Sequence, residues 1–341
     1  MSFPPKKIVF SLLSFGTCLL FLVTCYNIAW QGIYLAKEPK NENTKIFRIE
    51  KGQNVFTISE NLEKADLIKN KVFFELYVIL KGEVKDLKAG TFLFSPAMSI
   101  KDISQKIFKG ENLEIKITIP EGFSIEQIEE EINEKFETEN IEFRFKNQKE
   151  GLYKNEFSFL KDIPSDASLE GFLFPDTYLF KLDTTEKEIV ETFLRNFDKK
   201  LTPELQEKIQ EQNKTIFEII TMASLLEKEV KTLEDKKIAS GILWKRESSG
   251  MPLQVDATII FITGKKSTKV SVEETRIDSL YNTYKYKGLP PGPICNPGLD
   301  SIIAAIEPEA SNFWFYLSTP EGKTIFSKTL EEHNIAKAKY L

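Results

Sequence analysis

An acidic residue stands in the apolar face of the stretch 215–230, and it is the group in this sequence best placed to do chemistry. The apolar residues of this stretch recur at helical spacing, at Ile216, Ile219, Ile220, Ala223, Leu226 and Val230. At ~100° per residue, Glu227 falls between Ile216 and Ile220, on the face that should pack inward. Burial raises the pKa of a carboxyl group, which suits a donor that must hold its proton near neutral pH. The alternative is an edge Glu that forms an ion pair with a neighbouring Lys or Arg.

The same stretch carries two further acids, Glu218 and Glu229. Both project to one side of the apolar face, where carboxylates are ordinary solvated groups. Glu229 lies ~160° around the helix from Glu227. We therefore expect one catalytic acid in this helix, with Glu229 outside the site.

Four polar residues after this helix can orient a bound substrate. Gln254 and Asp256 precede a short predicted helix, Ala257–Ile262, for which Asp256 is a predicted N-cap. Asn282 and Tyr284 belong to a polar-aromatic turn. Each of the last three has an ordinary structural alternative, as a helix cap, a turn former or a packed ring.

Two irregular segments have compositions that fix their shape. The loop 288–298 has four prolines and three glycines in eleven residues, a rigid arrangement that is costly unless its shape matters. The segment 169–180 places aromatic residues around Gly171 and Pro175, which is typical of a core or a cleft wall. It also carries Glu170, which we expect to cap a helix or to line a cleft.

The remaining pattern predicts the elements that must position these groups, and it favours an α+β fold. The charged residues 137–168 are expected to form connecting surface. The predicted strands are Ile46–Ile49, Lys88–Phe94, Leu113–Ile119, Phe313–Ser318 and Thr324–Ser327, of which the last two form a hairpin. The predicted helices include Val55–Glu63, Ile125–Phe136, Glu186–Lys199, Pro203–Gln212, Leu233–Glu247 and Asp300–Ile306.

An uncharged N-terminal segment is long enough to cross a bilayer. Its apolar core, Ile8–Trp30, exceeds the ~20 residues that a membrane-spanning helix needs. Lys6 and Lys7 precede it and no comparable basic cluster follows closely, which predicts an N-terminus in the cytoplasm. A cleaved signal peptide is the alternative, but it would have a shorter apolar core and a small-x-small cleavage site.

The overall composition excludes several classes of function. With 46 basic and 51 acidic residues the net charge is −5, which lacks the basic footprint of a nucleic-acid-binding protein. A single His among 341 residues excludes a multi-histidine metal site. The three Cys are Cys18, Cys25 and Cys295, and two of them lie in the apolar N-terminal segment, so neither a disulfide framework nor a cysteine metal cluster is expected.

Five motifs, in this order behind the predicted membrane span, resemble the MltG/YceG family of endolytic murein transglycosylases. They are LEGFLFPDTY, ASLLEKEV, MPLQVDAT, YNTY and GLPPGPICNPG, across residues 169–298. The resemblance extends from Ile46 onward, more loosely over Ile46–Gly110, which is similar to the family's LysM-like subdomain. The sequence departs from the family pattern at Val255-Asp-Ala257, where Ser/Thr-Asp-Pro is more usual, and at Phe261, where Tyr is common.

The resemblance implies cleavage of the MurNAc-β-1,4-GlcNAc bond in nascent glycan strands, leaving 1,6-anhydro-MurNAc ends. The family's catalytic glutamate corresponds to Glu227. One carboxyl group is sufficient for this reaction, because the C6 hydroxyl of the sugar replaces the water that a hydrolase activates. The expected substrate-binding residues are Gln254, Asp256, Asn282, Tyr284 and Glu170, and no metal or cofactor is implied.

The residue pattern and the resemblance together predict a domain plan and a location. The expected plan is a cytoplasmic tail at 1–7, a transmembrane anchor at 8–36, a linker at 37–45, a LysM-like module at 46–113 and a mostly helical catalytic domain at 114–341. The anchor would be single-pass in the cytoplasmic membrane, with the catalytic domain outside. The expected partners are peptidoglycan strands, the membrane and peptidoglycan synthases, with no nucleic acid.

Two other functions remain open on the sequence. An inactive glycan-binding or scaffold protein of the cell-wall machinery would share this fold, although Glu227 and the loop 288–298 are intact. A muramidase-type hydrolase of the same bond would need a second carboxylate near Glu227, for which Asp256 is the expected residue.

Overall fold

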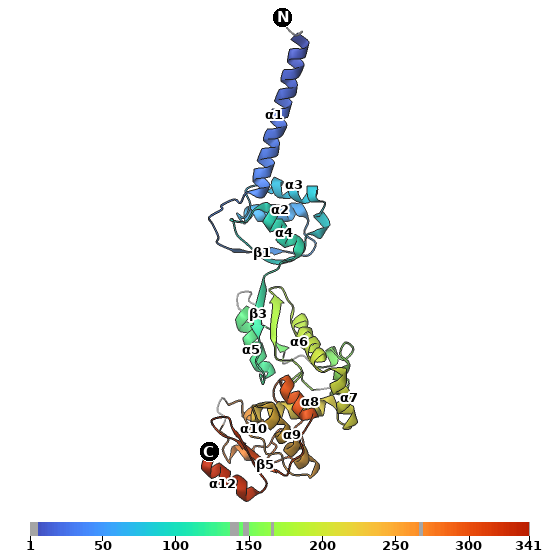
Figure 1. The fold of residues 1–341 in the computed structure, drawn as a ribbon, viewed down its shortest axis with the longest axis vertical. Helices are drawn as coiled ribbons and strands as arrows, with labels where there is room; N and C mark the ends of the chain where they lie inside the picture. The colour runs from blue at the N-terminus through green and yellow to red at the C-terminus, as the bar shows by residue number, and fades with distance from the viewer. Residues whose placement is uncertain (1–5, 137–142, 146–149, 165–166, 266–268, 341) are drawn as a thin grey trace. The chain divides into compact units, whose positions relative to one another are not determined.

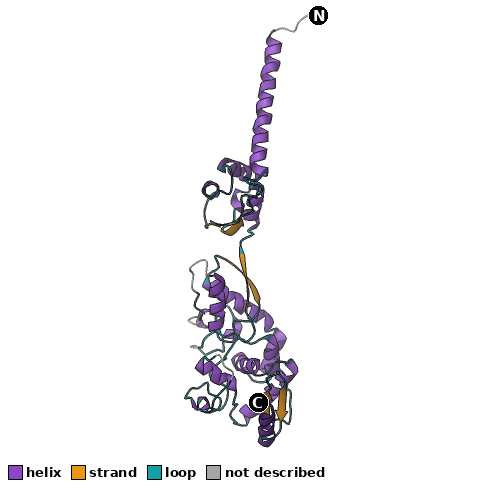
Figure 2. Ribbon diagram, turned by 90° about the vertical axis from the view of Figure 1, so that its left-hand side faces the viewer, coloured by secondary structure: helices purple, strands orange, loops and turns teal. Residues whose placement is uncertain are grey.

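The structure is a computed structural model, and it describes residues 6–136, 143–145, 150–164, 167–265 and 269–340 (Figure 1). The chain forms two compact units. Unit 1 contains Met1–Ile115 and Phe180–Asp183, and unit 2 contains Lys116–Leu179 and Thr184–Leu341. The secondary structure is mixed, with helices forming most of the body (Figure 2). The predicted α+β class is therefore confirmed.

The first element of unit 1 is a long apolar helix, α1 (Lys6–Tyr34). Its stretch Ser14–Tyr34 is long and apolar enough to cross a membrane, with a mean hydropathy of 1.3. At the end of α1, Ile33 is buried in the core of unit 1, and the Tyr34 ring meets the Tyr77 ring edge-on at 6.4 Å. The helix is therefore packed onto unit 1 at its C-terminal end.

The rest of unit 1 is a two-stranded sheet with three helices. Strands β1 (Lys45–Ile49) and β2 (Gly90–Phe94) pair antiparallel, with Phe47 opposite Phe92. The helices are α2 (Val55–Lys64), α3 (Lys71–Lys81) and α4 (Ile100–Lys109). Each begins at a polar cap, with Asn54, Asn70 and Ser99 accepting hydrogen bonds from backbone N–H groups of the first turn. Apolar side chains from all five elements close one core.

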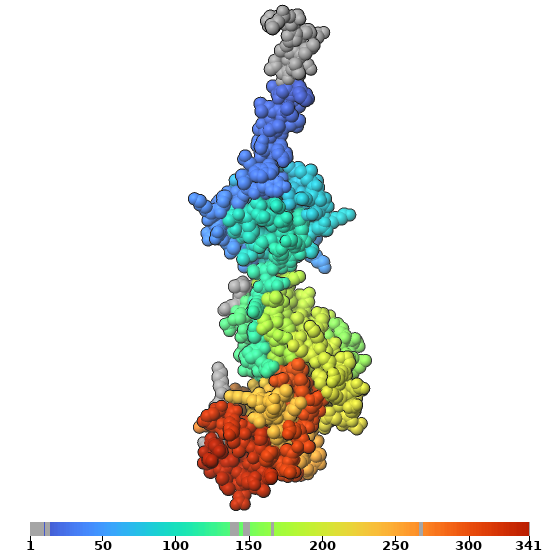
Figure 3. Space-filling model, viewed as in Figure 1, coloured from blue at the N-terminus to red at the C-terminus, as the bar shows by residue number. Residues whose placement is uncertain are grey.

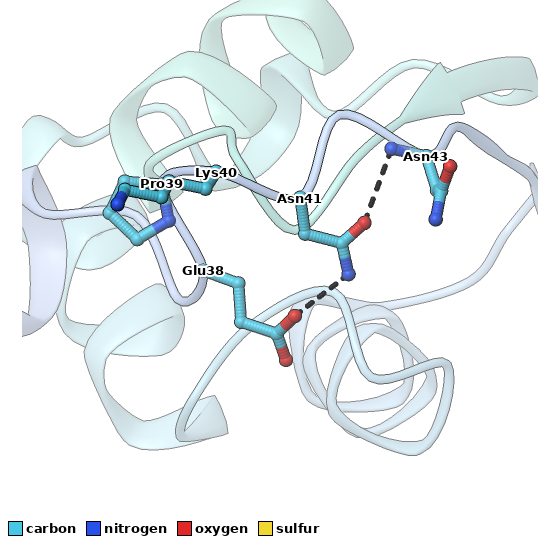
Figure 4. A pocket seen from close by; sticks show the side chains of 5 residues that line it. All are labelled: Glu38, Pro39, Lys40, Asn41 and Asn43. Carbon is cyan, nitrogen blue, oxygen red and sulfur yellow. Dashed lines mark hydrogen bonds between the residues drawn. The ribbon is translucent and has the colours of Figure 1, made fainter.

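The polar segment 37–45, predicted as a linker, is hydrogen-bonded to unit 1. The backbone N–H of Glu38 donates to the carbonyl of Pro96 at 2.9 Å. Figure 4 shows the Asn41 side chain donating to Glu38 at 2.7 Å and accepting from the Asn43 N–H at 3.2 Å. The residues that line the open hollow at this place are Glu38, Pro39, Lys40, Asn41 and Asn43. The segment thus has a defined local shape.

Unit 2 is mainly helical and contains the predicted site residues. Its helices are α5 (Ile125–Phe136), α6 (Glu186–Lys200), α7 (Pro203–Glu211), α8 (Ile216–Glu229), α9 (Leu233–Ser248), α10 (Asp256–Thr263), α11 (Leu299–Ile306) and α12 (Leu330–Tyr340). Helix α8 packs against α9 (Figure 1), and α11 packs against both of them. In Figure 3 the visible surface of unit 2 after residue 200 is coloured yellow to red.

The described residues after 113 also form four short strands. Strand β3 (Glu114–Thr118) pairs with β4 (Thr177–Lys181), and the division between the two units falls within both. Strand β5 (Phe315–Ser318) pairs antiparallel with β6 (Thr324–Ser327). Strand β4 was not predicted, because its aromatic residues lie in a segment that Gly171 and Pro175 mark as irregular.

The expectation that residues 137–168 form connecting surface is wrong where the structure describes them. Their aromatic side chains are buried, including Phe145, Tyr153 and Phe159. The Phe159 ring lies 4.7 Å from the ring of Phe197 in α6. The many charges in this segment hid the aromatic residues that fill the core. Residues 137–142, 146–149 and 165–166 lie outside the described part of the chain.

Candidate active site

Glu227 lies in the last turn of α8, where three donors converge on one of its oxygens. Its Oε2 accepts from Lys236 Nζ at 3.3 Å, from the backbone N–H of Gly298 at 3.1 Å and from Ser301 Oγ at 2.5 Å. Within the described part of the chain, no donor reaches Oε1. The Glu227 side chain is 10% exposed and that of Lys236 is 4% exposed. Glu227 therefore faces inward, as its position on the helix predicts. It also forms the ion pair with a Lys that the alternative interpretation predicts.

The local structure explains why these donors meet. Thr232 caps α9 three residues after α8 ends, which turns the chain back and brings Lys236 toward Glu227. Gly298 is the N-cap of α11, and Ser301 lies in the first turn of that helix. The start of a helix favours a negative charge because its N–H groups point outward unpaired. All three donors therefore hold the same oxygen of Glu227 in place.

The proline-rich loop 288–298 is attached to α8 and delivers Gly298 to the site. The backbone N–H of Ile294 donates to Ser224 Oγ at 3.0 Å, and the Cys295 thiol donates to the Ser224 carbonyl at 3.3 Å. Ser224 lies in α8, and all three residues are buried. The loop that composition predicts to be rigid is thus fixed at one end relative to Glu227.

Asn296 joins three segments that are far apart in the sequence. Its side-chain N–H group donates to the Phe123 carbonyl at 3.0 Å and to Glu170 Oε1 at 2.9 Å. Its side-chain oxygen accepts from the Leu173 N–H at 2.8 Å. The backbones of Gly122 and Phe123 also exchange hydrogen bonds with Asn296, at 2.8 Å each. Asn296 is fully buried, so this network holds the turn at 120–123 beside the loop.

Glu170, predicted to bind substrate, belongs to this buried network. Its two carboxyl oxygens accept from the N–H of Ile125, the first residue of α5, at 3.1 and 3.2 Å. Burial raises the pKa of Glu170 to about 8. The contacts are those of the helix-capping alternative that the sequence left open.

Glu229 is not the solvated carboxylate that its angle on the helix predicts. Burial, and after it the nearby Asp256 carboxylate, raise its pKa to about 7. The Tyr316 hydroxyl donates to the Glu229 carboxyl group and, with the N–H of Ala257, favours its charged form. The prediction failed because Asp256, Ala257 and Tyr316 come from segments that the periodicity of α8 does not describe.

The structure gives Asp256 a different local role from the predicted one. Helix α10 begins at Asp256 itself, and its N-cap is Val255, which makes no side-chain capping bond. The Asp256 carboxylate is exposed and accepts a hydrogen bond from the Tyr284 hydroxyl. The predicted N-cap is therefore wrong, and Asp256 and Tyr284 instead form a surface pair.

Gln254 and Asn282 lie close to this pair but differ in exposure. Gln254 has a φ of 55°, its N–H donates to the Thr283 carbonyl at 3.1 Å, and its side chain is exposed. A non-glycine residue in this region is strained, and such strain occurs preferentially at functional sites. Asn282 is fully buried and donates to the carbonyls of Thr275 and Ile277 at 3.0 and 2.8 Å. Its amide therefore shapes the loop from within.

One residue near Glu227 was missed by the sequence analysis. Glu121 lies in the turn 120–122, which the sequence presents only as the end of a strand. A Cβ placed on Gly298 would lie 2.0 Å from Glu121 Oε1, so this carboxyl group lies against the residue whose N–H binds Glu227. Burial raises the pKa of Glu121, and the charge of Glu227 raises it further. In the sequence, the only indication of this site residue is that an acid lies between Pro120 and Gly122.

Comparisons with known proteins agree with the resemblance seen in the motifs. The model of the YceG-like family matches residues 47–339. A protein of Streptococcus pneumoniae named endolytic murein transglycosylase is 34% identical over 325 residues, covering 87% of this chain and 59% of the relative. The Bacillus subtilis protein of the same name is 32% identical, covering 89% of this chain and 87% of the relative.

A solved structure shows the same fold. The crystal structure of a YceG-like protein from Listeria monocytogenes matches with a TM-score of 0.58 and 30% identity, covering 86% of this chain and 99% of that one. This chain spans 59% of the length of the Streptococcus pneumoniae relative. With its motifs, its fold and these matches in agreement, the chain belongs to the YceG-like family.

Proposed function

We propose that this protein is an endolytic peptidoglycan transglycosylase that cleaves the MurNAc-β-1,4-GlcNAc bond and leaves 1,6-anhydro-MurNAc ends. The relatives named endolytic murein transglycosylase support the substrate and the reaction. The observation that carries the proposal is Glu227, whose Oε2 is held by Lys236, Gly298 and Ser301 while its Oε1 is left for substrate. A scaffold protein would have no need of this arrangement.

The reaction needs two proton transfers and no water. One proton goes to the glycosidic oxygen as its bond to C1 of the muramoyl residue breaks. Another leaves the C6 hydroxyl of the same residue as its oxygen bonds to C1. The sequence assigns Glu227 as the acid, and the same group can then act as the base. Its three donors hold the carboxyl group in one position through both transfers.

The exposed pair of Asp256 and Tyr284, with the strained Gln254, is proposed to orient the sugar. These polar groups come from segments close together in unit 2. Asn282 and Glu170 are proposed to act indirectly, without contact with the sugar. The side chain of Asn282 holds the turn that carries Tyr284, and Glu170 holds the start of α5. We expect the larger effects on substrate affinity from Gln254, Asp256 and Tyr284.

The domain plan and location follow as part of the same proposal. Residues 46–113 form a LysM-like module that contacts glycan, and residues 114–341 form the catalytic domain with a hairpin at β5 and β6 near its end. Residues 1–7 lie in the cytoplasm, and residues 8–36 anchor the protein in the cytoplasmic membrane. The catalytic domain then lies outside, where it acts on new strands beside peptidoglycan synthases. The length and composition of α1 support the anchor.

The test is digestion of purified peptidoglycan by the full chain in detergent micelles, with mass spectrometry of the products. New 1,6-anhydro ends are expected. Reducing ends without the anhydro bond would identify a hydrolase, and an absence of cleavage would favour the scaffold function. In cells, deletion of the protein should lengthen glycan strands, and an unchanged length distribution would contradict a role in ending them.

A further inference from the structure

The contacts of Glu227 raise a chemical question about the first proton transfer. Its Oε2 receives an ammonium, a hydroxyl and an amide donor, so a proton on this oxygen would face the Lys236 ammonium and the Gly298 N–H. Lys236 is buried and is paired with no other acid among the described residues. The departing sugar oxygen, in contrast, needs a group that begins the reaction protonated. A second carboxyl group that keeps its proton would meet this need.

Glu121 is placed to be that group. Its Oε1 lies 2.0 Å from the position that a Cβ on Gly298 would take, and the Gly298 N–H binds Glu227 Oε2 at 3.1 Å. The next residue, Gly122, lies over α8, where its added Cβ would be 3.4 Å from Glu227 Cγ. Both carboxyl groups therefore border Gly298, while Glu121 itself is exposed to an approaching substrate.

The surroundings of Glu121 differ from those of Glu227. Among the residues that the structure describes, no hydrogen bond or ion pair holds its carboxyl group. Burial raises its pKa first, then the charge of Glu227 and that of Asp300 in α11, and only Lys236 in α9 acts in the opposite direction. Lys228 of α8 faces the adjacent Gly122, with Nζ 3.3 Å from its added Cβ. Two neighbouring acids in different environments are the usual arrangement of an acid and a base.

We propose that Glu121 is a second catalytic residue, which donates the proton to the departing sugar oxygen while the Glu227 carboxylate takes the proton of the C6 hydroxyl. The inference rests on the proposed function and assigns its two proton transfers to two groups. It also revises the part of Glu227, which acts as the base instead of as the acid.

The atoms and protons of this step balance without water or a co-reactant. Glu121 gives its proton to the glycosidic oxygen as the bond from C1 to that oxygen breaks. The C6 oxygen forms the new bond to C1, and its proton passes to Glu227. At the end Glu121 is a carboxylate and Glu227 is a carboxylic acid. Proton exchange between the two groups, which both border Gly298, restores the starting state.

The first test compares Glu121→Gln with Glu227→Gln on two substrates, using the full chain in detergent micelles. The substrates are purified peptidoglycan and a muramoyl glycan whose leaving group is dinitrophenol, which departs without a proton. Glu121→Gln should slow peptidoglycan cleavage by a factor of about 10² to 10⁴ and leave cleavage of the dinitrophenyl glycan within about tenfold of wild type. Glu227→Gln should slow both. Glu207→Gln, an exposed acid on α7, is the matched control.

The pH profile adds a readout that a structural role would not change. The rate of the wild type on peptidoglycan should fall on the alkaline side as Glu121 loses its proton, and Glu121→Gln should lose this limb. Melting temperatures equal to that of the wild type would show that the variants are folded, as expected for an exposed side chain.

Gly298→Ala tests the position of the carboxyl group without removing it. The added methyl group would meet the end of the flexible Glu121 side chain, which must swing away. The backbone of Gly298, with φ of −74°, accepts an Ala and keeps the N–H that binds Glu227. We expect a loss of about tenfold to a hundredfold on peptidoglycan and little loss on the dinitrophenyl glycan.

The outcomes separate this inference from the proposed function. If the wild type forms no 1,6-anhydro ends, the proposed function fails and the assignment fails with it. If the wild type forms them and Glu121→Gln keeps the wild-type rate on peptidoglycan, only the role of Glu121 is overturned. Equal losses by Glu121→Gln on both substrates would likewise overturn it, because they would show a role other than proton donation.

Discussion

The last turn of α8 places two glutamates in opposite electrostatic surroundings. Glu227 faces the Lys236 ammonium and the start of α11. Glu229, two residues later, faces the Asp256 carboxylate and the Tyr316 hydroxyl, and its pKa is raised to about 7 by burial and by that carboxylate. The same residue type on the same helix thus meets a positive charge on one side and a negative charge on the other. The chemistry of each acid is set by what packs against the helix and not by the helix itself.

This contrast also separates a reactive carboxyl group from a structural one. The Glu227 side has a second acid, Glu121, exposed beside it, and the loop 288–298 fixes the distance to α11. The Glu229 carboxyl group is enclosed by the start of α10 and by β5. Substitutions of the two glutamates should therefore differ in what they change, with Glu227 affecting the rate of cleavage and Glu229 affecting stability.

The largest effect should come from Glu227→Gln. Removal of the carboxylate should lower kcat for peptidoglycan cleavage by about 10³ or more, because one of the two proton transfers loses its group. Release of anhydro-ended fragments, followed by mass spectrometry, measures the loss, with Glu207→Gln as the control. Wild-type activity in Glu227→Gln would place the reactive carboxyl group elsewhere.

Lys236→Met should be the next most damaging change. It removes the buried ammonium and leaves a carboxylate that is 10% exposed without its counter-charge. Removal of one partner of a buried pair costs about 3–5 kcal/mol, which urea unfolding would measure. The double variant Lys236→Met/Glu227→Gln should recover much of this loss. Additive losses in the double variant would mean that the ion pair does not couple the two residues.

Glu229→Gln should change stability more than rate. The Glu229 carboxyl group has a pKa of about 7 in the folded protein and about 4.3 in the unfolded chain, so it keeps its proton to a higher pH in the folded state. Its contribution to the free energy of unfolding is greatest below about pH 4.3 and is lost as the pH rises through about 7. The variant should remove about 1–3 kcal/mol of the decline in unfolding free energy between pH 5 and pH 8.

Urea unfolding of both proteins at the two pH values is the measurement for Glu229. Glu170, whose pKa is raised to about 8, also lowers the free energy of unfolding as the pH rises. It is present in both the wild type and the variant, so its effect is the same in the two proteins. Peptidoglycan cleavage by Glu229→Gln should stay within about tenfold of the wild type. A loss of rate equal to that of Glu227→Gln would abolish the distinction between the two glutamates.

Tyr284→Phe should have the smallest effect of the set. It removes the hydroxyl that donates to the exposed Asp256 carboxylate, and water can replace that donor. We expect KM for glycan to rise about threefold to tenfold with kcat nearly unchanged. A fall in kcat with KM unchanged would instead show that this pair acts on the transition state.

Local patterns predicted much of the secondary structure. The expected helix at 215–230 is observed as Ile216–Glu229, and the expected strand Thr324–Ser327 is observed with the same bounds. These succeed because apolar periodicity and capping residues act within a few residues of chain. Strand β4 was missed, since its hydrogen-bond partner β3 lies about sixty residues away and leaves no local trace.

The candidate site divides in the same way. The helical phase placed Glu227 on an inward face, and the proline-rich composition of 288–298 identified a loop whose shape matters. The partners Lys236, Ser301 and Glu121 were not predicted. Nothing in a single sequence states which side chains from α9, α11 and the turn at 120–122 will meet one oxygen of Glu227.

The sequence by itself determined that one acid of α8 faces inward, because the direction of a side chain on a helix depends only on its position along that helix. Only the tertiary structure decided that this acid meets an ammonium and a helix start, that Glu229 meets another carboxylate, and that Glu121 lies against Gly298. The physical reason is that charge, burial and hydrogen bonding act through space, between segments brought together by packing of the whole unit.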